Sequence, residues 1–379
     1  MKLSFVTDIK KSHNTCKEYK GVKRYVDTGN VKGSKIIGFE EYTYDKKPSR
    51  ANVCVRAGDV LVAKMQNSIK VLLIDEENED FVYSTGFYAF RDERILPAFL
   101  KYFFLSPYFN HEKDIKCTGG TQKAINDGGM KKISINVPSI EEQEAIIAKL
   151  DLITEAVECE EDRIELYDEL VWSKYYEMFG DPIDNPMNWE TINLSELGVF
   201  KNGLNYDASE SGFEINCLGV GDFKDKFLIE DTSVLPTISL NTMPNENYLL
   251  QNEDIVFVRS NGNKELVGRC VAVYPDDNDI TFSGFCIRFR KDYKDILTEY
   301  LLYTLKTPAI RLMMRGKGSE IQNINQGILS ALVIPLTPIE LQKDFDSLVK
   351  EIRLAKEESI NKIDAFVELL NSLMHESFM

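Results

Sequence analysis

The strongest constraint on the fold is an internal repeat that divides the chain into two similar halves. Residues 58–62 (GDVLV) are similar to residues 253–257 (EDIVF), and residues 100–107 (LKYFFLSP) are similar to residues 300–308 (YLLYTLKTP). The repeated motifs keep their order along the chain. A repeat of this length indicates one structural unit duplicated in tandem, so each half must fold on the same plan.

Each half reads as short strands and tight turns followed by one long helix. Residues 53–55 and 60–62 are apolar runs on either side of a Gly-Asp turn, which is typical of neighbouring strands. The pattern then changes to apolar side chains at alternating spacings of four and three, which indicates a helix with a coiled-coil seam. Central positions of the two predicted seams are Leu150, Ile153, Val157, Glu160 and Ile164, and Leu348, Ile352, Ser359, Lys362 and Phe366.

Two seams of this length favour pairing of the helices with each other. We expect an α+β protein with two tandem globular domains joined by an antiparallel coiled coil of about 55 Å. The predicted segments are a domain at residues 1–138, a helix at 139–180, a domain at 181–336 and a helix at 337–379. In the antiparallel arrangement Glu160 falls near Ser359 and Lys362, where a polar contact would fix the register. The alternative is that each helix lies on its own domain.

Charge is distributed unevenly over these four segments. The 379 residues include 45 Lys and Arg against 61 Asp and Glu, a net charge of −16 that argues against a nucleic-acid surface. Residues 1–138, however, carry 23 basic and 17 acidic side chains, whereas residues 139–180 carry 3 and 13, residues 181–336 carry 14 and 22, and residues 337–379 carry 5 and 9. Because the helices hold most of the excess negative charge, we expect separate modules with separate partners.

The sequence contains little that predicts catalysis. The three histidines share no metal-ligand spacing, and the seven cysteines are scattered without a C-x-x-C pair, which indicates reduced thiols and no metal site. No P-loop, G-x-S-x-G or H-E-x-x-H motif occurs. We therefore expect a non-catalytic chain without a cofactor of its own. No apolar run approaches the length of a membrane span, so a cytoplasmic protein without membrane contact is expected.

Several duplicated motifs resemble one known family. Residues 137–143 (VPSIEEQ) and 334–342 (IPLTPIELQ) each lead into a long helix, the first helix ends in MFGDP at 178–182, and Lys201-Asn202-Gly203 opens the second copy. Asp59 and Asp254 begin equivalent strands. Together these features resemble the specificity subunit of type I restriction-modification systems, over essentially the whole chain.

The resemblance implies a DNA reader that is not itself an enzyme. Each globular unit would be a target recognition domain for one half of a bipartite site in double-stranded DNA. The paired helices would fix the gap between the half-sites and dock two methyltransferase (modification) subunits, which bind S-adenosylmethionine, with restriction/translocase subunits in the full complex. Other classes remain open from the residues alone: a self-sufficient DNA-modifying enzyme, or a coiled-coil scaffold without DNA binding.

Two loops in each copy are candidate DNA contacts because they combine cations with amides and hydroxyls. One loop follows an early strand, and the other is a glycine-rich loop near the end of the copy; the alternative for both is an ordinary polar turn. In the first copy the candidates are Lys64, Gln66, Asn67, Thr118, Gly119, Gly120, Thr121, Gln122 and Lys123; in the second they are Arg259, Ser260, Asn261, Lys264, Arg315, Lys317, Ser319 and Gln322.

A separate group of cations lies near the N-terminus. It comprises Lys10, Lys11, Lys17, Lys20, Lys23 and Arg24. Such a group is able to follow phosphates, but a solvated face is the commoner explanation. Because residues 181–336 are acidic overall, we expect the isolated chain to bind DNA weakly.

Overall fold

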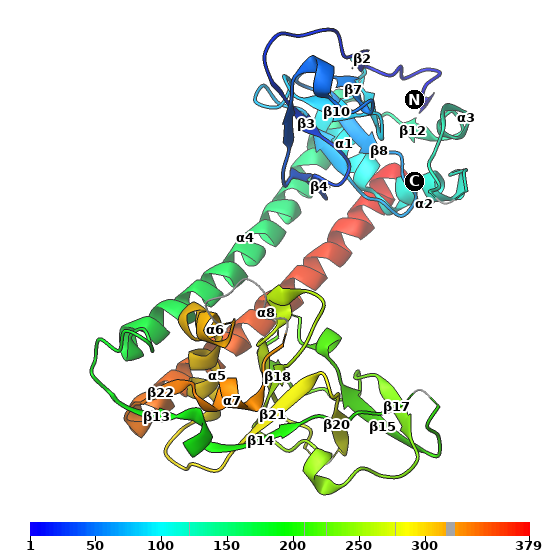
Figure 1. Ribbon diagram of the computed structural model, residues 1–379. Helices are drawn as coiled ribbons and strands as arrows, with labels where there is room; N and C mark the ends of the chain where they lie inside the picture. Colours follow the sequence, from blue (N-terminus) through cyan, green and yellow to red (C-terminus); the bar gives the residue numbers. More distant parts are fainter. Residues whose placement is uncertain (121, 208, 225, 277, 316–322) are drawn as a thin grey trace. The chain divides into compact units, whose positions relative to one another are not determined.

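The chain forms two compact units, each with strands and short helices of its own. The computed structural model describes residues 1–120, 122–207, 209–224, 226–276, 278–315 and 323–379. The first unit comprises Met1–Ile164 with Glu358–Met379, and the second comprises Glu165–Glu357. Each unit thus combines one globular domain with part of both long helices (Figure 1).

The first unit is built on two main sheets. The three-stranded sheet is antiparallel, with the order β11-β8-β9, and the five-stranded sheet has the order β2-β7-β10-β3-β6. Two smaller sheets pair β1 with β12 and β4 with β5. The strands are β1 Lys2–Ser4, β2 Asn14–Thr15, β3 Lys23–Val26, β4 Val31–Lys32, β5 Lys35–Ile36, β6 Glu40–Tyr42, β7 Ala51–Cys54, β8 Val60–Ala63, β9 Val71–Leu73, β10 Val82–Ser84, β11 Phe87–Phe90 and β12 Ser134–Asn136.

The second unit repeats this plan. Its five-stranded sheet has the order β14-β21-β18-β19-β16, and its three-stranded sheet has the order β17-β15-β20. A two-stranded sheet pairs β13 with β22. The strands are β13 Glu190–Asn193, β14 Gly198–Asn202, β15 Phe213–Leu218, β16 Leu228–Ile229, β17 Thr237–Leu240, β18 Asp254–Val258, β19 Cys270–Val273, β20 Ile280–Phe282, β21 Cys286–Lys291 and β22 Val333–Leu336.

Strand pairing confirms the duplication. The antiparallel run β11-β8-β9 corresponds to β21-β18-β19, and β1-β12 corresponds to β13-β22. The match includes a less common feature, a parallel pair: β10 lies parallel to β3 as β20 lies parallel to β15, and each of these pairs continues into an antiparallel strand, β6 or β17. The two copies therefore share this core topology, while β2 and β7 extend one sheet of the first copy and β14 and β16 extend the other sheet of the second.

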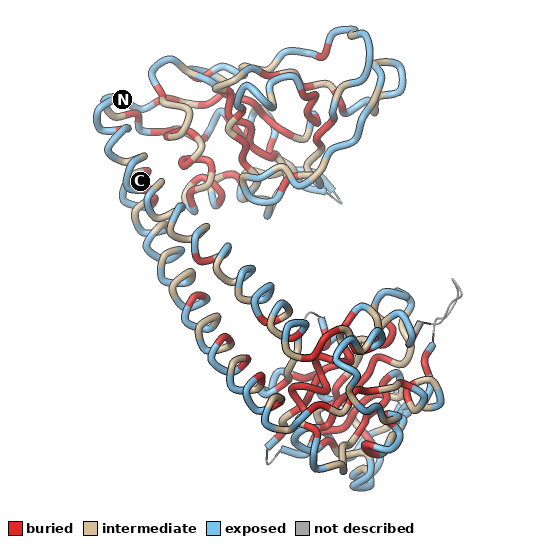
Figure 2. The backbone as a smooth tube through the Cα atoms, turned by 90° about the vertical axis from the view of Figure 1, so that its left-hand side faces the viewer, coloured by how far each residue is buried: buried red, intermediate tan, exposed pale blue. Residues whose placement is uncertain are grey.

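Short helices cover the sheets and complete each core. Proline occupies the first position of α1, α2 and α6, where its missing N–H costs nothing. Figure 2 shows the buried stretches gathered in the globular part of each unit. The short α-helices are α1 Pro97–Leu105, α2 Pro107–Ile115, α3 Asp127–Met130, α5 Thr298–Lys306, α6 Pro308–Arg315 and α7 Gln326–Ser330; 3-10 turns occur at Tyr44–Lys46, Leu194–Glu196, Val220–Asp222, Glu246–Tyr248 and Lys264–Leu266.

The two long helices, α4 (Ile140–Phe179) and α8 (Ile339–Phe378), pack together. In the first unit the start of α4 lies with the end of α8, since Leu150, Met374 and Phe378 share one apolar cluster. In the second unit the end of α4 lies with the start of α8, where the Phe179 and Phe345 rings are 5.4 Å apart. The predicted antiparallel pairing is therefore confirmed. The alternative, in which each helix lies on its own domain, does not hold for α8. Its Phe378 ring lies 5.1 Å from the ring of Phe99 in α1, which belongs to the first domain.

The predicted seam positions face inward to different degrees. Leu150, Ile352 and Ser359 are buried, as is Glu160, whereas Ile153, Val157, Ile164, Leu348, Lys362 and Phe366 are half-buried. The Glu160 carboxylate accepts a bond from Arg163 of its own helix at 2.9 Å, and Lys362 pairs with Glu358 at 2.7 Å. The pKa of Lys362 is raised chiefly by Glu358, with a smaller contribution from the charge of Glu160. The middle of the seam is thus a polar layer.

Near its end α4 departs from the predicted spacing. Continued past Ile164, the alternating spacing of the sequence predicts Lys174 and Met178 on the seam. The buried positions are instead Val171, Tyr175 and Phe179, which follow each other at intervals of four. The reason is that this end of the helix packs on α5 as well as on α8. The Tyr175 ring lies 5.8 Å from Phe345 of α8, and its hydroxyl bonds to Thr304 of α5 at 2.8 Å.

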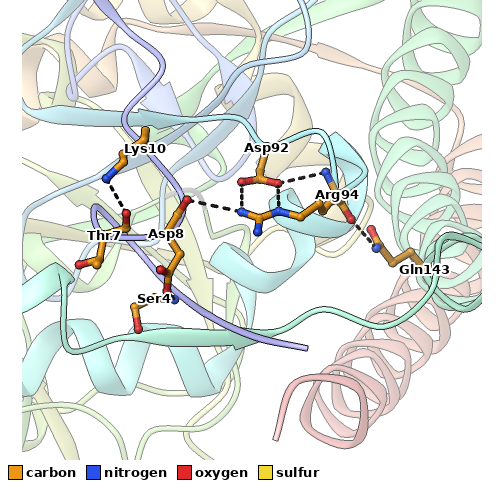
Figure 3. A network of polar contacts seen from close by, with 7 residues as sticks. All are labelled: Ser4, Thr7, Asp8, Lys10, Asp92, Arg94 and Gln143. Atoms are coloured by element: carbon orange, nitrogen blue, oxygen red, sulfur yellow. Dashed lines mark hydrogen bonds and ion pairs between the residues drawn. The ribbon is translucent and has the colours of Figure 1, made fainter.

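A buried glutamine fastens the start of each long helix to its domain. Gln143 and Gln342 are both fully buried. The Gln143 amide accepts from the main-chain N–H of Leu96 at 2.8 Å and donates to the carbonyls of Arg94 at 2.9 Å and Pro138 at 3.1 Å. Figure 3 shows this amide beside Arg94, whose guanidinium binds Asp92. Gln342 repeats the pattern with Leu297, Asp295 and Thr337.

A buried aspartate marks the start of equivalent strands. The Asp59 carboxylate precedes β8 and accepts from Arg91 at 2.9 Å, while Asp254 begins β18 and accepts two bonds from Arg290, at 2.8 and 2.7 Å. Each carboxylate also accepts from the main-chain N–H three residues earlier, at Arg56 or Gln251. The Gly-Asp and Glu-Asp motifs therefore have a structural explanation.

Candidate nucleic-acid interface

The structure brings the two candidate loops of the first copy together. The N–H of Ile125 donates to the carbonyl of Lys64 at 2.9 Å, and the N–H of Gln66 donates to the carbonyl of Lys123 at 3.0 Å. Met65 and Ala124 form an isolated antiparallel bridge between the loops. The loop after β8 and the loop before α3 thus form one surface, which we call the first loop pair (residues 64–67 and 118–124). Sequence reasoning proposed both loops but not their contact.

Most side chains of the glycine-rich loop are exposed. Thr118, Gln122 and Lys123 face solvent, and the loop is closed by a pair of main-chain bonds of 3.0 Å between Thr118 and Ala124. Gly119 has a φ of +129°, and a Cβ there would lie 2.9 Å from the carbonyl oxygen of Gln122. This turn therefore requires glycine. Gly120 is exposed as well, and Thr121 lies outside the described residues.

The side chains of Lys64 and Gln66 connect the first loop pair to neighbouring parts of the domain. The Lys64 ammonium donates to the carbonyl of Thr85 at 2.7 Å and lies 4.2 Å from the centre of the Tyr88 ring. The Gln66 amide donates to the carbonyl of Asp114 at 3.1 Å, which ties the loop to α2. Asn67 is exposed and has a φ of +55°, a conformation that asparagine tolerates better than most residues. Among the described residues of this loop pair, the side chains that face solvent are therefore those of Asn67, Thr118, Gln122 and Lys123.

A polar cluster that the sequence did not predict adjoins the first loop pair. The carboxylate of Asp127 accepts from the Tyr88 hydroxyl at 2.7 Å and from the Lys11 ammonium at 2.8 Å. These bonds, from Lys11 first and then Tyr88, lower the pKa of Asp127. Burial, together with the charges of Lys11 and Lys64, lowers the pKa of His13 below its usual 6.5. Lys11 and Lys64 are thereby held as two cations beside exposed amides.

The cations near the N-terminus have different partners and do not form one basic face. Lys11 belongs to the cluster around Asp127, whereas the Arg24 guanidinium lies over the Phe39 ring at 4.7 Å and Lys23 is 3.7 Å from Asp80. Spacing in the sequence could not separate these roles, because the positions of Asp127 and Tyr88 are set by strands and turns far along the chain.

The second copy repeats the loop contact. The N–H of Ile324 donates to the carbonyl of Arg259 at 2.9 Å, and Ser260 forms an isolated bridge with Asn323. The Arg259 guanidinium donates to the carbonyl of Gly284 at 3.4 Å, as Lys64 donates to Thr85. We call residues 259–264 with Asn323 and Ile324 the second loop pair. Arg259 therefore corresponds to Lys64 in both position and contact.

Other predicted residues of the second copy are placed as follows. Ser260 and Asn261 are half-exposed, the Asn261 side chain accepts from the N–H of Asn263 at 2.9 Å, and Lys264 is exposed at the start of a 3-10 turn. Arg315 ends α6. Lys317, Ser319 and Gln322 lie outside the described residues.

Close backbone contact explains the Lys-Asn-Gly motif that opens the second copy. A Cβ at Gly203 would lie 2.0 Å from the carbonyl oxygen of Ser283. Because that atom belongs to the main chain, only glycine fits here. The motif therefore positions the turn before β21, from which the second loop pair is held.

The described residues offer nothing that would hold a metal ion, since they contain no group of three His, Cys, Asp or Glu side chains suited to one. All seven cysteines lie within the described part of the chain and are free thiols. Among the described helices, none is long and apolar enough to cross a membrane.

Comparison with known proteins gives one consistent result. A family model described as the type I restriction modification DNA specificity domain matches residues 5–166 and 186–364. The StySPI type I restriction enzyme specificity subunit of Salmonella potsdam is 25% identical over 338 residues, which cover 83% of this chain and 72% of the relative. The EcoKI specificity subunit of Escherichia coli K12 is 22% identical over 320 residues, with coverage of 78% and 67%.

Solved structures have the same fold. A chain from a study of complex assembly and conformational transition in the type I R-M system has a TM-score of 0.65 at 18% identity, and the match covers 100% of this chain and 97% of that one. The type I S subunit of M. genitalium has a TM-score of 0.51 at 17% identity, with coverage of 100% and 96%.

Proposed function

The chain belongs to the type I restriction modification DNA specificity family. On this basis we propose which parts of the chain contact DNA and which contact partner subunits. It is a DNA recognition subunit with two recognition domains, and it is not the catalyst. In our proposal the first loop pair contacts one half of a bipartite target in double-stranded DNA and the second loop pair contacts the other half.

The observation that carries this proposal is the duplicated loop contact. In each copy a main-chain bond of 2.9 Å joins the two candidate loops, from Ile125 to Lys64 and from Ile324 to Arg259. Side chains able to read base edges stand at these loops, including Gln122 in the first and Asn261 in the second. Because the exposed side chains differ between the copies, the two half-sites should differ in sequence.

We further propose that the helices dock two methyltransferase (modification) subunits. Apolar side chains on the outer faces of α4 and α8 support this: Leu152 and Ile360 of the first unit are 68% and 48% exposed, and Leu166 and Leu354 of the second unit are 62% and 67% exposed. Exposed apolar side chains on a helix give a docked partner apolar area to bury. The strong negative charge of residues 139–180 favours a partner with a basic surface.

The remaining parts of the complex follow from the same proposal. S-adenosylmethionine would be bound by the modification subunits and by no site of this chain, and restriction/translocase subunits would join the assembled complex. The complex would act in the cytoplasm, where the host DNA lies.

The test is to map methylated bases in DNA modified by the chain together with its modification subunits. We expect one bipartite motif with a fixed gap. Gln122→Ala should change the base preference in one half of the motif only, whereas Lys123→Ala, one residue away, should weaken binding to all sequences. The chain alone, incubated with S-adenosylmethionine and DNA, should transfer no methyl group. Unchanged motifs in both Gln122→Ala and Asn261→Ala would contradict the assignment of the loop pairs.

A further inference from the structure

An exposed phenylalanine adjoins the second loop pair. Phe285 lies in the turn between β20 and β21 and is 60% exposed. Its carbonyl oxygen accepts the main-chain N–H of Arg259 at 2.8 Å and that of Ser260 at 3.3 Å. The loop that carries candidate base readers is therefore bonded directly to the residue that carries this exposed ring.

The main chain on the other side of Phe285 is also held. The N–H of Phe285 donates to the hydroxyl of Ser283 at 3.3 Å, and the N–H of Gly284 donates to the carbonyl of Leu204 at 2.7 Å. The ring is thus presented from a main chain that is bonded to two other segments. Less conformational entropy is lost on binding when the side chain that meets a ligand starts from a fixed position.

The first copy has a glycine at the equivalent position. The carbonyl of Gly86 accepts from the N–H of Lys64 at 2.9 Å, as the carbonyl of Phe285 accepts from that of Arg259. The side chains of these two cations agree with this correspondence, because each donates to the carbonyl of the preceding residue of its turn. A Cβ at Gly86 would lie 3.0 Å from the methyl carbon of Thr28, which leaves little room for a large side chain. At this position an exposed ring therefore belongs to the second copy alone.

Polar side chains beside this ring are of the kinds that read base edges. Ser260 and Asn261 are half-exposed, and Arg259 precedes them. Arginine, serine and asparagine bond to the polar groups of base edges, whereas the apolar group on those edges is the 5-methyl group of thymine, which phenylalanine is able to contact. The surface of the second domain thus combines polar readers with an apolar one.

DNA offers two apolar features to such a ring, the thymine methyl group and the face of a base. The faces are stacked on each other in a duplex, so a side chain that inserts between them must first unstack two base pairs. The methyl group lies open in the major groove of an undistorted duplex. Because Phe285 is bonded to a loop of edge-reading residues, contact with the methyl group requires no such distortion.

We propose that Phe285 contacts the 5-methyl group of a thymine in the half-site of the second domain. This inference rests on the proposed function of the second loop pair. Burial of one methyl group against the ring favours thymine by roughly fourfold over a base that lacks the methyl group. The first domain has no such contact at the equivalent position, because Gly86 has no side chain.

The test uses the complex with its modification subunits and target duplexes in which deoxyuridine replaces each thymine in turn. Deoxyuridine keeps the hydrogen-bonding groups of thymine and lacks only its methyl group. We expect one position in the second half-site at which the wild-type complex loses affinity by roughly fourfold. Phe285→Gly, which reproduces Gly86 of the first copy, should bind thymine and deoxyuridine equally well at that position.

The salt dependence of binding separates this contact from a phosphate contact. Phe285→Gly should bind the thymine duplex roughly fourfold more weakly than wild type. The slope of log affinity against log salt should stay the same, because the ring carries no charge and releases no counterion.

Two further variants serve as controls. Phe285→Leu keeps an apolar side chain and should retain part of the preference for thymine. Val234→Gly removes a side chain of similar exposure, 64%, from the loop before β17 and should change neither the affinity nor the preference. The ratio of affinities for the two duplexes is measured within one variant, so a smaller folded fraction does not alter it.

Several outcomes would overturn the proposal. One is a wild-type complex that binds its target equally well with deoxyuridine at every thymine. Another is a Phe285→Gly complex with the same preference for thymine as wild type; weaker binding with an unchanged preference would indicate insertion of the ring between bases. Failure of the wild-type complex to select any target would instead contradict the proposed function of the loop pairs.

Discussion

In residues 1–138 basic side chains outnumber acidic ones by 23 to 17, whereas in residues 181–336 the acidic ones prevail by 22 to 14. The two segments nevertheless share the core strand order of both sheets and hold their long helices with an equivalent buried glutamine. In the first unit Lys11 and Lys64 approach one loop pair, while in the second unit Arg259 occupies the position equivalent to Lys64. The scaffold was kept after the duplication, and the distribution of surface charge diverged.

Buried polar groups show what the duplication preserved. Gln143 and Gln342 make equivalent bonds, and so do Asp59 and Asp254 with their arginines. These groups lie inside the domains, where an unpaired donor or acceptor is costly, so neither copy tolerates their loss. The exposed loops have no such constraint. The comparison therefore separates residues that maintain the fold from residues that are free to change the target.

The largest expected effect concerns the buried aspartates, and it should differ between the copies. Asp254→Ala is expected to destabilise the second unit by about 3 to 5 kcal/mol, because it leaves the partner arginine without its charge. Asp59→Ala should cost less, because Asp59 receives one bond from Arg91, whose side chain is 38% exposed, while Asp254 receives two from Arg290, whose side chain is 24% exposed. Native-state hydrogen exchange, read separately for each unit, measures both values.

The exposed Asp292→Ala serves as the control for this pair of variants and should change stability by less than about 0.5 kcal/mol. An equal loss in both aspartate variants would show that the second arginine bond contributes nothing.

The glutamine anchors come next. Gln143→Leu and Gln342→Leu are each expected to cost about 2 to 3 kcal/mol, because each leaves a buried main-chain N–H and two carbonyls unsatisfied. The loss should be local: the amide of Leu96 should exchange faster in the first variant and that of Leu297 in the second. Glu144→Leu, one position after Gln143 and exposed, is the matched control. Faster exchange across both units in either variant would contradict independent anchors.

A smaller effect tests the equivalence of the two loop pairs. Lys64→Met and Arg259→Met should each reduce the affinity of the assembled complex for its target by about threefold to tenfold, with a salt slope shallower by about 0.9. The reason is that the two cations occupy the same position and bond to equivalent turns. Fluorescence anisotropy at several salt concentrations checks this. A change in only one variant would show that the copies use these positions differently.

The smallest effect is a pH dependence of opposite sign in the two units. Burial raises the pKa of Glu299 above its usual 4.5, although Arg353 partly opposes this. Its contribution to stability is therefore complete below pH 4.5 and is lost as the pH rises through the higher folded pKa. Glu299→Gln should abolish this loss in the second unit, a change of less than about 1 kcal/mol at pH 7.

In the first unit the bond from Arg94 lowers the pKa of Asp92 below its usual 3.8. Its contribution is present above pH 3.8 and is lost as the pH falls through the lower folded value. Urea unfolding of the Glu299→Gln and Asp92→Asn variants between pH 3 and pH 7 checks both signs. Parallel pH profiles in the two variants would contradict this difference between the units.

Much of the architecture could be predicted from the sequence because it depends on local patterns. Alternating spacings of four and three predict a long helix wherever they occur, and two such seams of similar length favour an antiparallel pair. The exception at the end of α4 is instructive. The alternating spacing places Lys174 on the seam, but the buried residue is Tyr175. The reason is that this part of α4 also packs on α5, and the spacing of apolar residues in α4 contains no information about that contact.

The candidate sites were predictable only in part. The loops at residues 64–67 and 118–123 have the composition of polar turns, and nothing in their spacing indicates that they share main-chain bonds. The cluster of Lys11, Tyr88 and Asp127 is assembled from three distant segments.

The sequence by itself therefore determined the duplication, the long helices, their pairing and the family. Each of these is encoded by repetition or periodicity along the chain. Only the tertiary structure decided which loops meet and which cations support them. The physical reason is that charged and amide side chains act through distance in space, and strands and turns set that distance between residues that no local pattern connects.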